Sequence, residues 1–167
     1  MRTPYALTAL AVVLTATAAY AGPQVTDAAG GFSYTAPDGW KATTMAASKY
    51  KIAYAKPSGG FAANFNVVEE DAPTPLPNYV RVSVANLKTM MPGYHLVSQT
   101  PFVTKSGLHG FKVVTNAAPQ GRELRQTYFL FPGPGTRKVV VTASVLQAQA
   151  AKYAGPIDAA MKTFTVK

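Results

Sequence analysis

The densest run of strand-forming residues lies at positions 121–146. Two runs of mainly aromatic and β-branched residues, 127–131 and 139–145, flank the Gly- and Pro-rich segment 132–136. A strand, a glycine-containing turn and a second strand predict a β-hairpin. Because apolar side chains occupy successive positions in both strands, both faces of the hairpin need a cover. The pattern therefore places this hairpin at the centre of a sheet that has other elements packed on each side.

The first half of the chain predicts further antiparallel strands. Residues 32–34 alternate apolar and polar as an edge strand does, and the turn after them returns Trp40 to the core. Residues 50–56 and 61–68 flank a glycine-containing turn and predict a second hairpin. The apolar positions expected to face inward in this second hairpin are Ile52, Tyr54, Phe61, Phe65 and Val67.

The spacing of apolar residues predicts a helix over residues 79–91, because it changes to the 3.6-residue period of a helix. The positions that form its apolar stripe recur every three or four residues: Val80, Val84, Leu87 and Met91. The segment before it, 69–78, begins with three carboxylates, contains three prolines and predicts a loop. The carboxylate spacing matches no calcium-binding loop, so a solvated acidic cluster is favoured over a metal site.

Short connections after this helix predict an antiparallel meander that leads into the hairpin. Its strands are expected at residues 94–100, 102–105 and 110–115. The C-terminal region is alanine-rich at 147–154 and predicts a helix over 156–164 that starts at a Gly-Pro pair. This helix carries an apolar stripe and is expected to cover one face of the sheet.

The N-terminus has the pattern of a secretory signal peptide. Arg2 precedes an apolar run at 6–19, and Ala19 and Ala21 stand in the A-x-A spacing that signal peptidase requires. Cleavage is expected after Ala21. The apolar run is shorter than the roughly 20 residues of a membrane-spanning helix, so no transmembrane anchor is expected after cleavage.

The expected organisation is a signal peptide at 1–21, a flexible lead-in at 22–30 and a single domain at 31–167. Such a signal predicts a periplasmic or secreted bacterial protein. The chain contains no cysteine, which excludes disulfides, thiolate metal sites and a lipoprotein anchor.

The formal net charge of the chain is +9. An exported basic protein meets anionic surfaces and acidic proteins before nucleic acid, so an envelope protein or an anionic surface is the expected partner. Solubility alone is the competing explanation of the charge. Between positions 105 and 138, six basic side chains stand against one carboxylate, Glu123, and form the candidate interaction surface: Lys105, Lys112, Arg122, Arg125, Arg137 and Lys138.

No arrangement of residues in the sequence predicts catalysis, a cofactor or a metal. The two histidines, His95 and His109, lie near no carboxylate or other ligand type in sequence. The Gly-Pro-Gly turn of the hairpin precedes a strand and no helix, which argues against a phosphate-binding loop. A non-enzymatic binding protein is therefore expected.

The alternative is a carrier of a small apolar or anionic ligand in a cavity between the sheet and the helices. The residues expected to line that cavity are Met91, Phe111, Tyr128, Phe129 and Phe131.

The order of these elements also carries a family resemblance over most of residues 31–166. The segments that carry it are Phe32-Ser33-Tyr34, Pro37-Asp38-Gly39-Trp40, Asn64-Phe65-Asn66-Val67-Val68, Gly110-Phe111-Lys112, Tyr128-Phe129 and Val139-Val140-Val141-Thr142, with Phe164 closing the chain. In this order the chain resembles the PsbP-like superfamily, which includes PsbP, the Ran-binding Mog proteins and DcrB-type bacterial envelope proteins.

The resemblance implies an α+β fold in which a central antiparallel sheet has helices on both faces, an α-β-α sandwich. It also implies a binding or accessory module and no catalyst. The matching positions are core and turn residues, so the resemblance assigns no functional residue.

Overall fold

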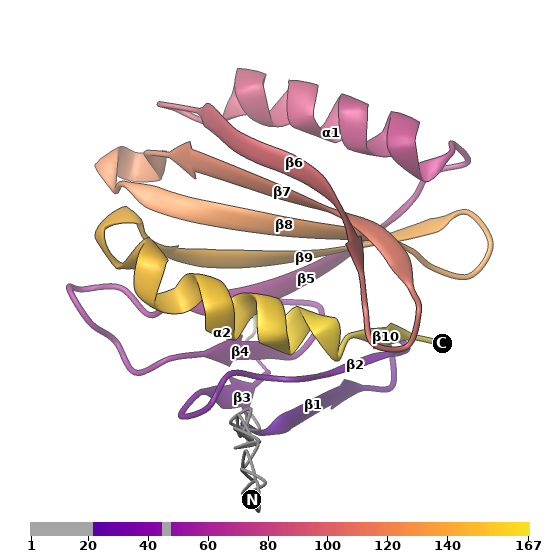
Figure 1. The fold of residues 1–167 in the computed structure, drawn as a ribbon, viewed down its shortest axis with the longest axis horizontal. Coiled ribbons are helices and arrows are strands. Elements are labelled where there is room, and N and C mark those ends of the chain that lie inside the picture. Colours follow the sequence, from indigo (N-terminus) through magenta and orange to yellow (C-terminus); the bar gives the residue numbers. More distant parts are fainter. Residues whose placement is uncertain (1–21, 45–47) are drawn as a thin grey trace, which may run out of the picture.

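The hairpin predicted at residues 121–146 lies inside a seven-stranded antiparallel sheet with strand order β3-β4-β5-β9-β8-β7-β6 (Figure 1). The structure, a computed structural model, describes residues 22–44 and 48–167. The predicted signal peptide, 1–21, lies outside the described residues. The strands of the large sheet are β3 (Lys41–Thr43), β4 (Ile52–Tyr54), β5 (Asn64–Asp71), β6 (His95–Val103), β7 (His109–Ala117), β8 (Leu124–Pro132) and β9 (Arg137–Leu146).

The β8–β9 hairpin has apolar side chains on both faces, as its sequence predicts. Phe129 pairs with Val141, and both are fully buried on one face of the sheet. Leu130 pairs with Val140, and both are buried on the other face. Because side chains alternate along a strand, each face of the hairpin packs against a different layer.

A small second sheet joins the two ends of the described chain. Its strands, in the order β1-β2-β10, are β1 (Gln24–Asp27), β2 (Phe32–Thr35) and β10 (Thr165–Val166). β2 is therefore a central strand, and its prediction as an edge strand is wrong. A long-range hydrogen bond, between the hydroxyls of Ser33 and Thr165 at 2.9 Å, accompanies the β2–β10 pairing.

The predicted flexible lead-in at 22–30 is wrong, because its middle forms β1. Val25 is fully buried, and the side chain of Asp27 accepts hydrogen bonds from the backbone N–H groups of Gly30 at 2.9 Å and Lys51 at 3.0 Å. Burial raises the pKa of Asp27, but these backbone donors outweigh burial and hold the pKa below its usual value. The segment is part of the fold.

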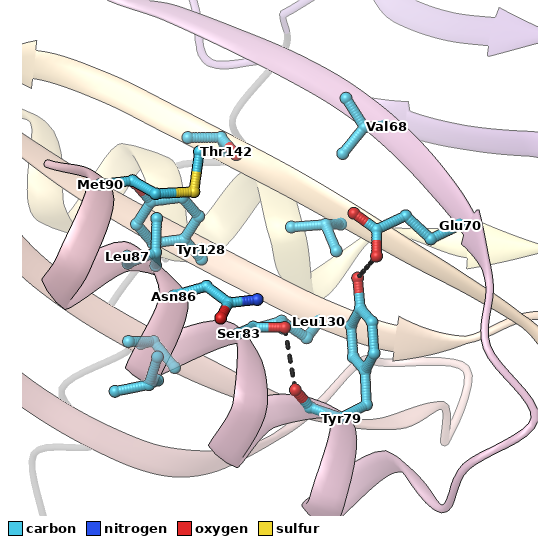
Figure 2. Close-up of a pocket in the computed structure, with 13 residues that line it drawn as sticks. Val68, Glu70, Tyr79, Ser83, Asn86, Leu87, Met90, Tyr128, Leu130 and Thr142 are labelled. Carbon is cyan, nitrogen blue, oxygen red and sulfur yellow. Dashed lines mark hydrogen bonds between the residues drawn. The ribbon is translucent and has the colours of Figure 1, made fainter.

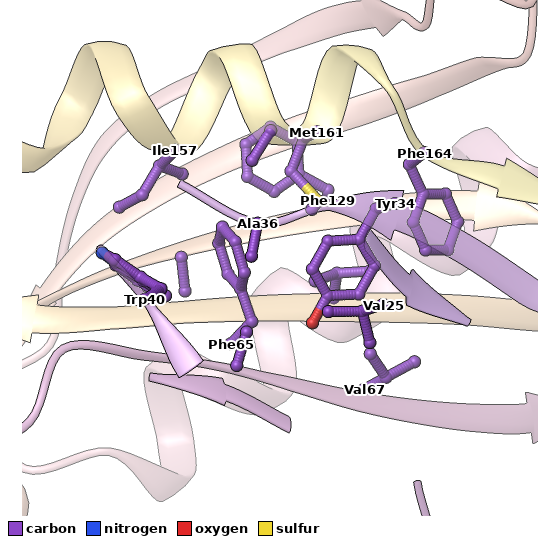
Figure 3. Packing of buried hydrophobic residues seen from close by; sticks show 14 of the residues in the cluster. Val25, Tyr34, Ala36, Trp40, Phe65, Val67, Phe129, Ile157, Met161 and Phe164 are labelled. Carbon is purple, nitrogen blue, oxygen red and sulfur yellow. The ribbon is translucent and has the colours of Figure 1, made fainter. Parts of the chain in front are cut away.

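The main core lies between the large sheet, the small sheet and helix α2 (Ala150–Lys162). Figure 3 shows aromatic side chains meeting in this core. Phe131 stacks on Phe164 with ring centroids 5.0 Å apart, and Trp40 lies 5.0 Å from Phe65. The prediction that Trp40 is a core residue is confirmed by its exposed fraction of 6%.

Helix α2 begins six residues before the predicted start at 156 and runs through Pro156. A proline inside a helix removes one backbone hydrogen bond. The first half of the helix nevertheless buries Ala150 and Tyr153 in the main core. This tertiary packing compensates for the lost bond.

Helix α1 (Leu76–Met90) covers the opposite face of the large sheet. It starts three residues before the predicted position, with Pro77 in its first turn, where a missing N–H costs nothing. The predicted loop at 69–78 is also shorter, because β5 continues to Asp71, which pairs with Arg137. The predicted α+β sandwich, with helices on both faces of an antiparallel sheet, is confirmed.

Two details of the meander also differ from the sequence prediction. β6 is one continuous strand through Pro101, where two strands were expected. The proline is tolerated because β6 is an edge strand. Short 3₁₀ turns precede β8 and α2, at η1 (Pro119–Gly121) and η2 (Gln147–Gln149).

Candidate binding groove beside helix α1

Helix α1 covers only part of its face of the large sheet. It packs on β7 and β8 through Val80, which is fully buried. On β5, which β9 separates from β8, Val68 is 42% exposed and Asn66 is exposed. A groove of about 260 Å³, here called the α1 groove, opens between the helix and strands β5, β9, β8 and β7 (Figure 2). Its lining residues are Val68, Glu70, Tyr79, Ser83, Val84, Asn86, Leu87, Met90, Val113, Tyr128, Leu130, Val140 and Thr142.

One row of side chains on α1 forms the wall of this groove. Tyr79, Ser83, Asn86 and Met90 recur at intervals of three and four residues, which places them on one side of a helix. Met90 is 77% exposed at the C-terminal end of this row, although it borders the groove. An exposed methionine is a flexible apolar contact for another molecule.

Hydrogen bonds fix the polar groups at the N-terminal end of the groove. The hydroxyl of Tyr79 donates to a carboxylate oxygen of Glu70 at 2.9 Å, and the hydroxyl of Ser83 donates to the carbonyl oxygen of Tyr79 at 2.8 Å (Figure 2). Burial, followed by the bond to Glu70, raises the pKa of Tyr79 to about 12.

Tyr128 lies on the floor of the groove, where burial raises its pKa to about 12. Its hydroxyl donates to the side-chain oxygen of Gln126 at 2.9 Å. Both groove tyrosines therefore stay neutral at physiological pH. Among the lining residues, Glu70 is the single charged side chain, so the groove offers apolar surface and neutral polar groups.

A second hollow of about 700 Å³ continues the groove on the same side of the sheet. The two are neighbours because Asn66, which lines the second, pairs with Thr142, which lines the first. The β4 residues Ile52 and Tyr54 line this β4–β5 hollow and are half-buried. Their predicted inward orientation is wrong: Ala53 takes the core position, since it pairs with the fully buried Phe65.

Phe61 also lines this hollow and is only half-buried, so its inward prediction is wrong as well. Phe65 and Val67, the other two inward predictions for the second hairpin, are buried in the main core.

No protein-family model matches the sequence, and a search of curated proteins finds no match. Solved structures do match. LpqN of Mycobacterium tuberculosis, involved in cell envelope biogenesis, has a TM-score of 0.65 and 12% identity, over 81% of this chain and 83% of LpqN. Cyanobacterial PsbP from Synechocystis has a TM-score of 0.60 and 10% identity, over 91% of this chain and 96% of that one. The Ran-binding protein Mog1p of Saccharomyces cerevisiae has a TM-score of 0.58 and 11% identity, over 89% and 96% of the two chains.

The chain has the PsbP/Mog-type fold. The resemblance stated from the sequence is confirmed at the level of the fold. At these identities the PsbP/Mog-type fold brings no residue role with it. The candidate site therefore depends on the geometry of this chain.

The PsbP/Mog-type fold does not bring the six predicted basic residues together. Arg137 and Lys138 are neighbours in β9, so their side chains point to opposite faces. Arg137 contacts Glu69 at 3.1 Å. Lys138 is buried, and its ammonium donates to the carbonyl oxygens of Ala72 at 2.7 Å and Thr136 at 2.9 Å. Lys138 therefore holds two loops together.

Of the other four basic residues, two lie together and two lie apart. Lys112 pairs with Asp158 on α2, with both carboxylate oxygens at 2.6 Å, and Lys112, Asp158 and Arg125 line one hollow beside α2. The guanidinium of Arg122 lies 5.5 Å from the ring of Phe61 near the β4–β5 hollow, and Lys105 is exposed in the turn after β6.

Lys112, Arg125 and Arg137 lie on the α2 face of the sheet, whereas Lys138 is buried on the other face. Arg122 and Lys105 lie in connections between strands, so the six residues form no single continuous surface. Contact of any of them with a partner stays a prediction.

The predicted ligand cavity also differs from the observed groove. Of its five expected lining residues, Tyr128 lines the α1 groove. Phe129 and Phe131 belong to the main core on the opposite face, and Met90 replaces Met91 in the lining. Phe111 packs at the edge of the smaller core under α1.

His95 and His109 are exposed near opposite ends of the β6–β7 ladder, where they pair with Asn116 and Val103. They therefore share no site. Within residues 22–44 and 48–167, no cluster of three or more His, Asp or Glu side chains could hold a metal ion. In the same described part of the chain, no helix is long and apolar enough to cross a membrane.

Sequence reasoning missed the α1 groove because the groove depends on where the helix lies across the sheet. For the adjoining β4–β5 hollow, one local signal was available. Asn64 and Asn66 occupy alternate positions of a strand, although asparagine is depleted in strands. Two such residues on one face indicate a surface that strand stability alone does not explain.

Proposed function

We propose that this protein is an exported, non-enzymatic binding protein that holds an envelope protein in the α1 groove. The observation that carries the proposal is the partly covered sheet face, with Val68 and Met90 exposed at the groove and Val82 exposed on the helix one turn before Asn86. Exposed apolar side chains that gather beside a groove are typical of protein-binding surfaces. A fold shared with the Ran-binding protein Mog1p and with LpqN, involved in envelope biogenesis, supports this role.

The groups in the groove favour binding over catalysis. The raised pKa values of Tyr79 and Tyr128 keep both hydroxyls protonated at neutral pH. The carboxylate of Glu70 accepts a hydrogen bond from Tyr79, and the hydroxyl of Ser83 donates to the carbonyl oxygen of Tyr79, so Glu70 is not paired with the serine hydroxyl as a base. Such a site selects a partner by shape and apolar contact.

The variant Met90→Glu is expected to reduce capture of the envelope partner by at least about tenfold, because it places a carboxylate in an apolar contact. Capture is measured with immobilised protein and detergent-solubilised envelope from the native host. The matched control is Ala85→Glu, which adds the same charge at an exposed position of the same helix. Equal capture by the two variants would contradict the proposal.

Ionic strength separates apolar docking from electrostatic recruitment. Capture through the groove is expected to persist in about 1 M salt, where the screening length falls to about 3 Å. Capture that disappears in high salt would instead support electrostatic recruitment and would contradict apolar docking in the groove.

Export is tested on the protein isolated from its host. Its N-terminal sequence is expected to begin at Gly22, in the periplasmic or culture fraction. Recovery of the full chain, starting at Met1, from the cytoplasmic fraction would contradict export.

A second candidate function is transport of a small apolar molecule in the α1 groove. The supporting observation is the groove volume of about 260 Å³ over a floor of Val113, Leu130 and Val140. Native mass spectrometry of protein from its own host distinguishes the two functions. A stoichiometric small adduct that the variant Leu87→Trp displaces supports the carrier, whereas a bare mass supports the protein-binding role.

A further inference from the structure

A row of uncharged hydrogen-bonding side chains crosses the α1 side of the large sheet. In the strand register Tyr54 pairs with Asn64, Asn64 with Ser144, and Ser144 with Gln126. Paired residues of neighbouring strands share a face, so all four side chains lie on the same side. Asn66 and its partner Thr142 lie beside them. We call this set the amide row: Tyr54, Asn64, Asn66, Gln126, Thr142 and Ser144.

Strand propensity does not explain the two asparagines of the amide row. Asn66 is exposed and Asn64 is half-buried, while Phe65 between them is fully buried in the main core on the other face. Asparagine is among the residues that strands disfavour. A locally unfavourable choice without a structural gain is expected at functional positions.

Hydrogen bonds within the row leave some of its donors and acceptors without a partner in the row. Tyr128 donates to the side-chain oxygen of Gln126 at 2.9 Å, and the amide of Gln126 donates to the hydroxyl oxygen of Ser144 at 3.4 Å. The proton of the Ser144 hydroxyl is then available to another acceptor. The amide nitrogen of Asn64 donates to the carbonyl oxygen of Ala62 at 2.9 Å, which leaves its side-chain oxygen as an acceptor.

The charge of the surface selects the ligand class. No residue of the amide row is charged at neutral pH, in a chain whose formal net charge is +9. One basic side chain, Arg122, lies near the β4–β5 hollow, with its guanidinium 5.5 Å from the ring of Phe61. Binding to a neutral ligand is therefore expected to be independent of salt, whereas binding of an anion there would weaken as salt is raised. The rings of Tyr54 and Phe61 line the adjoining hollow of about 700 Å³ and offer apolar faces beside the polar row. A ligand with neutral hydroxyl groups beside apolar C–H faces would complement both the polar row and the aromatic rings.

We propose that the amide row and the β4–β5 hollow bind a neutral, hydroxyl-rich saccharide chain. The inference rests on the proposed function, in which the α1 side of the sheet is the binding side. It adds a chemical class of ligand and a second contact region outside the α1 groove. The amides and hydroxyls would bond the sugar hydroxyls, while the rings would pack on the C–H faces of the sugar.

The test is an NMR titration of the ¹⁵N-labelled protein with N-acetylchitohexaose, cellohexaose and maltohexaose, each to about 10 mM, so that binding with a millimolar Kd is detected. At least one probe is expected to shift the side-chain amide signals of Asn64, Asn66 and Gln126. The variant Asn66→Ala is expected to weaken that binding about fivefold to tenfold, in line with the loss of one or two hydrogen bonds. The control Asn78→Ala changes an exposed asparagine in the first turn of α1 and is expected to bind normally.

Three results would overturn the saccharide site. The first is the absence of shifts with all three probes, and the second is unchanged affinity in Asn66→Ala. The third is capture of an envelope protein that Asn66→Ala abolishes without any saccharide binding, which would assign the row to a protein. If no saccharide binds but Met90→Glu still reduces capture of the envelope protein, only the saccharide site is wrong. If a saccharide binds but Met90→Glu does not reduce capture, only the proposed role of the α1 groove is wrong.

Discussion

Replacing Phe129 by alanine is expected to lower the free energy of unfolding by about 4 kcal/mol. Phe129 is fully buried in the middle of β8, with its ring 4.9 Å from that of Phe102. Removing the ring leaves a cavity in a core where β9 holds the neighbouring side chains in place. Urea denaturation followed by far-ultraviolet circular dichroism measures the change.

The matched control for this core substitution is Val82→Ala. Val82 is 46% exposed on α1, so its truncation is expected to change the free energy of unfolding by less than about 0.5 kcal/mol. A similar loss in the two variants would show that the β8–β9 hairpin is not the centre of the core.

Alkaline pH is expected to unfold the protein as buried tyrosines ionise. Burial raises the pKa of Tyr79 and Tyr128 to about 12 and raises that of Tyr34 as well. A pKa raised by folding gives stability that is complete below the unfolded value near 10 and is lost as the pH rises through the folded value. The loss is therefore expected between about pH 10 and 12, on the order of 2 kcal/mol for each of the two groove tyrosines.

Denaturant titrations at neutral pH and at several steps up to about pH 12 measure this loss. The variant Tyr79→Phe is expected to be slightly less stable at neutral pH, because it loses the bond to Glu70. It should lose about 2 kcal/mol less than the unaltered protein on going to pH 12. Equal alkaline losses in the two proteins would contradict a buried, neutral Tyr79.

Local patterns predict the central elements of the fold correctly. The β8–β9 hairpin follows from two runs of strand-forming residues around a Gly- and Pro-rich turn. The apolar side of α1 follows from periodicity, because its inward residues repeat with the period of a helix. The small second sheet does not follow from local pattern. Its strands β2 and β10 come from opposite ends of the domain, as the pairing of Ser33 with Thr165 shows, and no short segment records that contact.

The candidate site is less predictable than the fold. A run of basic residues along the chain suggested one surface, yet the alternation of side chains in β9 separates Arg137 from Lys138. The α1 groove depends on how far α1 extends across the sheet, which tertiary packing decides. Asn64 and Asn66 gave one indication in the sequence of a site beside β5, because asparagine is an unfavourable residue type in a strand.

The proposed binding side of the sheet is tested most directly by crosslinking in the native host. A photoreactive benzophenone residue is placed at Met90, beside the α1 groove, or at Lys152, which is exposed on α2. A discrete protein adduct is expected from position 90 and none from position 152. Adducts from position 152 with none from position 90 would contradict a binding surface on the α1 side.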